Sequence, residues 1–296
     1  MESDRGSARA EPAEIRVRDM RFELGAHVPS HFCPSHPEFS HAATAFMAAL
    51  PQLEPYFIHN IREASSAIED SLLKAQIALF VSQEARHAQQ HRALNELLAP
   101  RYPELPRLER EIKARLDRSR AHHSLGFRMA YTAGYEAITY QLVGFMMHEK
   151  DTWLADADPN VFALLCWHGA EEVEHKSVAF DAFQAVHGGY AMRVLGLLAA
   201  LVMTVKDIRR MVRHMLEVDG TWSDRACRRR LQRVRLAFAR GLLPKLLGYL
   251  RPGYHPAHYP DPPVMIGWLA RHAAGEDLRQ MTASSLGNSA QHGVQR

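Results

Sequence analysis

The sequence is poor in cysteine. Its three cysteines, Cys33, Cys166 and Cys227, are far apart in a chain of 296 residues. An odd number of isolated cysteines builds no disulfide framework, and no Cys-x-x-Cys motif is present for metal or redox chemistry. The first twenty residues are charged and lack the apolar segment of a secretory signal. These absences predict a cytoplasmic protein with reduced thiols.

The sequence also has few long apolar runs. Residues 194–205 read VLGLLAALVMTV and are followed directly by Lys206, whereas a membrane-spanning helix needs about 20 apolar residues. One interpretation is a buried helix or one that forms a homodimer. The other is peripheral membrane contact through residues 190–251, because a basic segment follows the apolar run.

The net charge of +3 hides an uneven distribution of charge. Residues 206–251 hold thirteen Lys and Arg but only four acidic residues. This is typical of a solvated helix face, and the alternative is contact with a phosphate-rich partner or an anionic membrane. We expect no nucleic-acid partner, because no recognised binding motif is present.

Alternating β patterns are almost absent between residues 38 and 250, where apolar residues instead recur at helical spacing. The expected helices lie near 40–64, 67–98, 105–149 (perhaps divided near 122–126), 158–187, 190–217 and 223–249. Residues 1–37 are predicted to be extended or loop-like. Residues 251–296 are predicted to be a loop and a tail, because 251–264 contain five prolines and the chain after about residue 280 is expected to be disordered.

Two copies of one motif stand out in this helical region. Glu84 and His87, in FVSQEARHAQQH, and Glu172 and His175, in HGAEEVEH, are both Glu-x-x-His pairs. Residues three apart share a helix face, so each pair can offer an oxygen and a nitrogen to one metal ion. A single pair could equally be a satisfied core group or a surface pair. However, at about 100° per residue both pairs fall inside the apolar stripe of their helices.

Two further helices each place one glutamate in their apolar stripe. Glu136 is the only acidic residue between Asp117 and Glu149. In the first helix Glu54 lies on the apolar side, whereas Glu63 lies opposite and is expected in solvent. Glu174 is likewise expected to face solvent.

One Glu from each of two helices and a Glu-x-x-His from each of two others is the arrangement of ferritin-like di-iron and di-manganese bundles. The sequence therefore predicts an all-α, ferritin-like four-helix bundle with additional C-terminal helices and two metal ions, Fe or Mn. His168 shares the face of Glu172 and is predicted as a further ligand. His91 and Glu171 are predicted to support the ligands. The predicted ligands are Glu54, Glu84, His87, Glu136, His168, Glu172 and His175.

The strings FVSQEARHAQQHRALNELL, WHGAEEVEHKSVAFDAFQAVHGGY and RPGYHPAHYPD resemble the bacterial family of predicted metal-dependent hydrolases in the ferritin-like group, over about residues 25–265. The order of the site residues alone is similar to that of the di-iron arylamine N-oxygenases of the 4-aminobenzoate type. That second resemblance implies that His168 is an iron ligand.

The leading hypothesis is an O2-activating di-iron oxygenase that N-oxygenates or hydroxylates a small organic substrate, with no catalytic residue beyond the metal ligands. Its electrons would come from an external donor, because no Gly-x-Gly-x-x-Gly fingerprint for a nucleotide cofactor is present. One alternative is a two-metal hydrolase. The other is a non-catalytic ferritin-like protein that binds metal or associates with a membrane.

Overall fold

The computed structural model describes residues 14–287, and within this range the regular secondary structure is entirely helical, with no β-strand. Predictions made for residues 1–13 and 288–296 lie outside the described residues. The α-helices are α1 (Pro37–Ser65), α2 (Ser71–Leu98), α3 (Leu105–His122), α4 (Leu125–His148), α5 (Lys150–Trp153), α6 (Pro159–His175), α7 (Val178–Val186), α8 (Tyr190–Val218), α9 (Arg225–Tyr249) and α10 (Pro263–Ala273). Two 3-10 turns are η1 (Pro256–His258) and η2 (Ala283–Leu286).

Side-chain caps explain where several helices begin. The Asp70 carboxylate accepts hydrogen bonds from the backbone of α2, and Asp158 does the same for α6. Ser124 caps α4 by accepting from the Phe127 backbone N–H at 3.3 Å. Each cap satisfies amide groups that the first helical turn leaves without partners.

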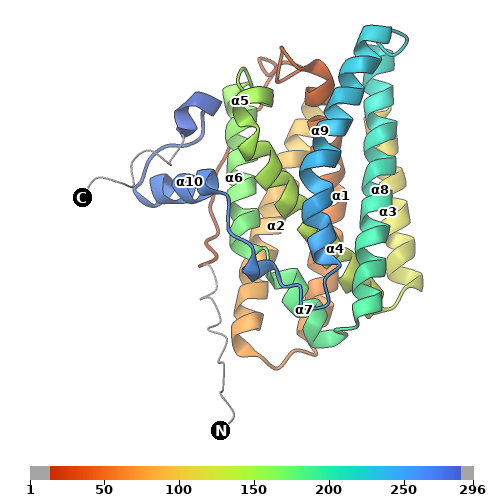
Figure 1. Ribbon diagram of the computed structural model, residues 1–296, viewed down its shortest axis with the longest axis vertical. Helices are drawn as coiled ribbons and strands as arrows, with labels where there is room; N and C mark the ends of the chain where they lie inside the picture. The colour runs from red at the N-terminus through yellow and green to blue at the C-terminus, as the bar shows by residue number, and fades with distance from the viewer. Residues whose placement is uncertain (1–13, 288–296) are drawn as a thin grey trace.

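Four positions of a helical bundle surround the interior of the molecule (Figure 1). Helix α1 packs against α2 and α4, and the fourth position is shared by α6 and α7, which contact α2 and α4. Outside this group α8 runs along α4. A side chain at Gly134 would place its Cβ 2.7 Å from the Leu197 backbone, so glycine permits this close approach.

The all-α fold is therefore confirmed, and the structure adds detail at two breaks. The expected helix 105–149 is divided into α3 and α4, at the place that the sequence left open. The expected helix 158–187 is instead interrupted after His175, so that α7 starts at Val178. Apolar periodicity continues across both breaks and does not by itself mark them.

The C-terminal region is more ordered than predicted. As expected, residues 251–262 contain no α-helix, but α10 follows and packs against α6. Ala283 and Leu286 are buried, and the Met281 backbone N–H donates to the Pro159 carbonyl at 3.1 Å. The tail predicted from about residue 280 is thus wrong for residues 280–287, which are held by contacts with the start of α6.

None of the helices in residues 14–287 is both long and apolar enough to cross a membrane. Helix α8 nevertheless exposes a row of apolar side chains, Leu195, Leu198, Val202 and Val205. Peripheral membrane contact and homodimer formation through this region stay predictions. The three cysteines are buried and unpaired.

Candidate metal centre

The structure brings all seven predicted ligand side chains together inside the bundle. Each is buried, and the largest exposed fraction among them is 6 %, at His168. Helix α1 contributes Glu54, α2 contributes Glu84 and His87, α4 contributes Glu136, and α6 contributes His168, Glu172 and His175.

One half of the cluster is centred on His175. Its Nε2 atom lies 3.4 Å from Glu84 Oε1, 3.4 Å from Glu136 Oε2 and 3.4 Å from Glu172 Oε1. One nitrogen and three carboxylates thus face a common point, within range of a single cation.

The other half is formed by His87, His168 and Glu54. His87 Nδ1 lies 3.5 Å from Glu84 Oε1 and 4.0 Å from Glu172 Oε1. His168 Nε2 lies 2.8 Å from Glu172 Oε1 and 3.9 Å from Glu54 Oε1. Glu84 and Glu172 belong to both halves, which is the placement that carboxylates bridging two ions would need.

Seven of the polar atoms that face this interior have no hydrogen-bond partner. They are both carboxylate oxygens of Glu54, Glu84 Oε1, His87 Nδ1, Glu136 Oε2, Glu172 Oε2 and His175 Nε2. Buried polar atoms normally have a hydrogen-bond partner, and each one without a partner lowers the stability of the fold by about 1–3 kcal/mol. These unpaired nitrogen and oxygen atoms come from four helices and face one place, an arrangement that fits bound cations.

When no cation is bound, burial and neighbouring charges shift the pKa values of several side chains in the cluster. Burial and the neighbouring Glu172 raise the pKa of Glu136 to about 8. Burial, with Glu84 next in weight, raises the pKa of Glu54 well above its usual value. Burial acts to lower the pKa of His87, but hydrogen bonds with Glu171 and Glu84 raise it to about 10. Protons therefore partly neutralise the carboxylates when no metal is bound.

A neighbour outside the cluster sets the tautomer of His175. Its Nδ1 lies 2.8 Å from Gln83 Oε1, while Gln83 Nε2 donates to Glu174 Oε2 at 3.0 Å and to the Arg16 carbonyl at 3.1 Å. Because both partners of the Gln83 amide nitrogen are acceptors, its oxygen must face His175. Nδ1 of His175 then carries the proton, and Nε2 keeps a lone pair for the cluster.

Glu171 orients His87 in the same way. Its Oε2 lies 3.0 Å from His87 Nε2, and its Oε1 accepts from Trp167 Nε1 at 3.1 Å and from the Arg18 guanidinium at 3.4 Å. A carboxylate accepts only, so Nε2 of His87 donates, and Nδ1 faces the cluster, where it can present a lone pair once its proton is lost to a bound cation. Glu171 thus contacts a predicted ligand, and its supporting role stays a prediction.

His91 stands behind His168. Its Nε2 lies 2.7 Å from His168 Nδ1, on the far side of the ring from Glu172. This geometry places His91 in contact with a predicted ligand, although His91 also lies within reach of a group formed with His168 and Glu54.

Glu63 was predicted correctly: it pairs with Arg128 at 2.8 Å, away from the cluster. Glu174, Arg18 and Gln83 were misjudged or missed. The prediction for Glu174 is wrong, because Arg18 covers it and donates to its Oε1 at 2.6 Å. Arg18 was missed because it lies in a segment without helical periodicity. Gln83 had one signal, its place beside Glu84 at the border of the apolar stripe.

Comparison with known proteins gives one match. The family model described as predicted metal-dependent hydrolase matches residues 16–259, which include every residue of the cluster. No curated protein and no solved structure matches the chain. Since the matched residues make up most of the sequence, the chain belongs to the family of predicted metal-dependent hydrolases.

Proposed function

We propose that this protein is a hydrolase that uses two metal ions held by the seven clustered side chains. The observation that carries the proposal is the set of orphaned buried atoms around Glu84 and Glu172, the two carboxylates shared by both halves. The family description supports hydrolysis. When bound, paired ions supply an activated water and a Lewis acid for the substrate.

The protein's own residues prepare the centre in three ways. Four carboxylates offset the charge of two divalent cations. Gln83 and Glu171 hold the two Glu-x-x-His imidazoles with the correct nitrogen inward. The rings of Phe80 and Trp167 lie 4.8 Å from the rings of His175 and His87, respectively, and exclude water beside them.

A cavity of about 460 Å³ supports a route for a small organic substrate. Its lining includes Tyr140 and Gly144 on α4 and Lys245 on α9. Tyr140 lies one helical turn beyond Glu136. The ammonium group of Lys176, the residue after His175, lies 5.1 Å from the centre of the Tyr140 ring. We propose that the substrate approaches the centre from this side.

The donor set favours a second candidate function, oxidation by O2. The cluster contains four glutamates and no aspartate, with a histidine three residues after two of the glutamates. This ligand set on four helices is the one found in di-iron carboxylate proteins. On this account the protein would be an oxygenase that receives electrons from an external donor.

One experiment separates the two functions. In the first assay, metal-free protein is loaded with Zn²⁺ or Mn²⁺ and tested for hydrolysis of aryl esters, amides and phosphate esters. In the second assay, metal-free protein is loaded anaerobically with Fe²⁺ and tested for O2 uptake in the presence of arylamines. Glu84→Ala is the inactive control and Glu63→Ala the matched control on a glutamate outside the cluster. Hydrolysis that is lost only in Glu84→Ala supports the hydrolase. Substrate-dependent O2 uptake without hydrolysis supports the oxygenase. The absence of both activities would contradict both proposed functions.

A further inference from the structure

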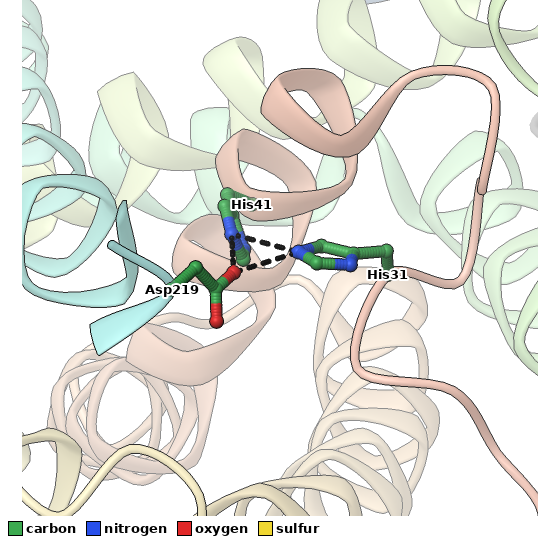
Figure 2. A group of neighbouring side chains, drawn as sticks. All are labelled: His31, His41 and Asp219. Atoms are coloured by element: carbon green, nitrogen blue, oxygen red, sulfur yellow. Dashed lines mark hydrogen bonds and ion pairs between the residues drawn. The ribbon is translucent and has the colours of Figure 1, made fainter. Parts of the chain in front are cut away.

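A second cluster of metal-binding side chains lies at one end of the bundle, outside the centre described above. His31 precedes α1, His41 lies in the first turns of α1, and Asp219 follows α8 (Figure 2). Asp219 Oδ2 lies 2.7 Å from His31 Nε2 and 2.8 Å from His41 Nε2. The two Nε2 atoms are 3.2 Å apart. Two nearby histidines and an aspartate 178 residues after the second of them thus direct one nitrogen or oxygen each at one point.

Hydrogen bonds alone leave this triangle crowded. If both imidazoles donate to Asp219 Oδ2, the two N–H groups lie side by side with their nitrogens only 3.2 Å apart. If one imidazole presents its lone pair instead, that lone pair faces the carboxylate oxygen at less than 3 Å. A cation between the three atoms removes the conflict, because both nitrogens and the oxygen then present lone pairs to it.

The surroundings keep the three groups in the required state. Burial, with the neighbouring His31, lowers the pKa of His41 to about 4. Arg101 donates to the other oxygen of Asp219, Oδ1, at 2.7 Å, and the Tyr102 hydroxyl lies 3.4 Å from both carboxylate oxygens, so these two residues fix the orientation of the carboxylate. The His31 side chain is 31 % exposed, whereas those of His41 and Asp219 are 0 % and 6 % exposed. An ion and one water can therefore enter from the side of His31.

We propose that His31, His41 and Asp219 bind one divalent transition-metal ion of the Zn²⁺ type. Two imidazoles and one carboxylate suit Zn²⁺, whereas Ca²⁺ and Mg²⁺ prefer oxygen ligands. Tetrahedral Zn²⁺ with bonds of about 2.0–2.1 Å holds its ligand atoms about 3.3 Å apart. The two nitrogens lie 3.2 Å apart, close to this value, whereas Asp219 Oδ2 lies 2.7 and 2.8 Å from them, so the carboxylate must rotate away from the imidazoles to admit an ion.

Such an ion would tie the segment before α1 to the ends of two helices. The same segment carries Arg18, which contacts Glu171 and Glu174 beside the central cluster. The ion therefore stabilises the chain that covers the central cluster and is a structural element of the fold. A ligand that binds only the folded state raises its stability in proportion to its saturation.

The test uses Co²⁺, which occupies zinc sites and absorbs visible light strongly when tetrahedral. The full chain first receives Glu84→Ala and Glu172→Ala, which disable the central cluster. This double variant is titrated with Co²⁺, and so is a triple variant that also carries His31→Gln. His27→Gln, at an exposed histidine of the same segment, is the matched control. We expect one equivalent of bound Co²⁺ with a tetrahedral spectrum, lost in His31→Gln and kept in His27→Gln.

No Co²⁺ binding in the disabled chain, or the same binding after His31→Gln, overturns the proposal. Should the double variant fail to fold, the unmodified chain and its His31→Gln variant are compared for Zn²⁺ content and for the fall in Tm on adding a chelator. One equivalent less Zn²⁺ and a smaller fall in Tm in His31→Gln support the site. Equal zinc content and equal falls in Tm overturn it.

Discussion

Single residues outside the central cluster decide how its histidines can act. Gln83 and Glu171 do not face the interior of the cluster, yet each fixes which nitrogen of an imidazole carries the proton. Outer contacts of this kind orient metal ligands and tune their basicity. The centre is thus defined by more residues than its seven inward-facing side chains.

Replacing Gln83 by leucine should weaken metal binding while the ligands stay in place. The change removes the acceptor for His175 Nδ1, so the ring loses its fixed tautomer and orientation. We expect the metal affinity to fall by about 10–100-fold, measured by competition with a chromogenic chelator. The control is Gln89→Leu, the same change at an exposed position of α2. Equal affinities in the two variants would contradict the role of Gln83.

Metal binding should release protons at neutral pH. With pKa values of about 8 for Glu136 and about 10 for His87, both groups are protonated at pH 7 in the metal-free protein. A bound cation needs both as deprotonated ligands, so affinity should increase as the pH rises from 6 towards 8. Calorimetry in buffers of different ionisation enthalpy measures the released protons. Binding that is independent of pH would show that these groups are not ligands.

The sequence predicted which polar residues lie in the apolar stripes of the helices. It did not predict which distant segments pack over the helices. Helical spacing correctly separated Glu54, in the interior, from Glu63, which pairs with Arg128 at the surface. The same reasoning placed Glu174 in solvent, because position on one helix carries no information about a distant segment. Glu174 is buried by Arg18, 156 residues earlier in the chain.

At the scale of whole elements, regular helices were predictable and the irregular segment before α1 was not. Caps such as Asp70 and Asp158 and the 3.6-residue apolar period mark α2 and α6 in the sequence. Residues 14–36 have no such period, although they bury Ile15, Met20 and Phe22 against the bundle. Their conformation depends on ion pairs with α6 and cannot be derived from local propensity.

Arg18→Met tests the importance of that segment. The substitution leaves the buried carboxylates of Glu171 and Glu174 without their guanidinium partner. Loss of one partner from a buried ion pair costs about 3–5 kcal/mol. We expect the free energy of unfolding, from urea denaturation, to fall by this amount. Arg21→Met, at an exposed position of the same segment, should change it little. Equal stabilities would show that Arg18 does not hold the segment in place.

For the molecule as a whole, the ordered C-terminal region helps to form the cavity through which we propose that the substrate approaches. Residues 260–264 form one wall of the cavity that α4 and α9 complete. The sequence predicted a proline-rich loop here but could not predict the cavity, because its walls come from segments about 100 residues apart. The cavity is thus a property of the assembled fold.

Filling the cavity should slow the reaction without removing metal. A Cβ at Gly144 would lie 3.5 Å from Lys245 Nζ and 3.7 Å from Pro262, so alanine fits and leucine extends into the cavity. We expect Gly144→Leu to lower kcat/KM by about tenfold or more, a loss of about 1.4 kcal/mol, with unchanged metal content. Gly144→Ala should retain most of the activity. Full activity in Gly144→Leu would place the substrate route elsewhere.

Anomalous diffraction from crystals of the metal-loaded protein, recorded on both sides of the absorption edge of the metal, tests the two-metal centre directly. We expect two anomalous peaks between α1, α2, α4 and α6, each in contact with both Glu84 and Glu172. A single peak among these helices, or none, would contradict a two-metal centre built from the seven side chains.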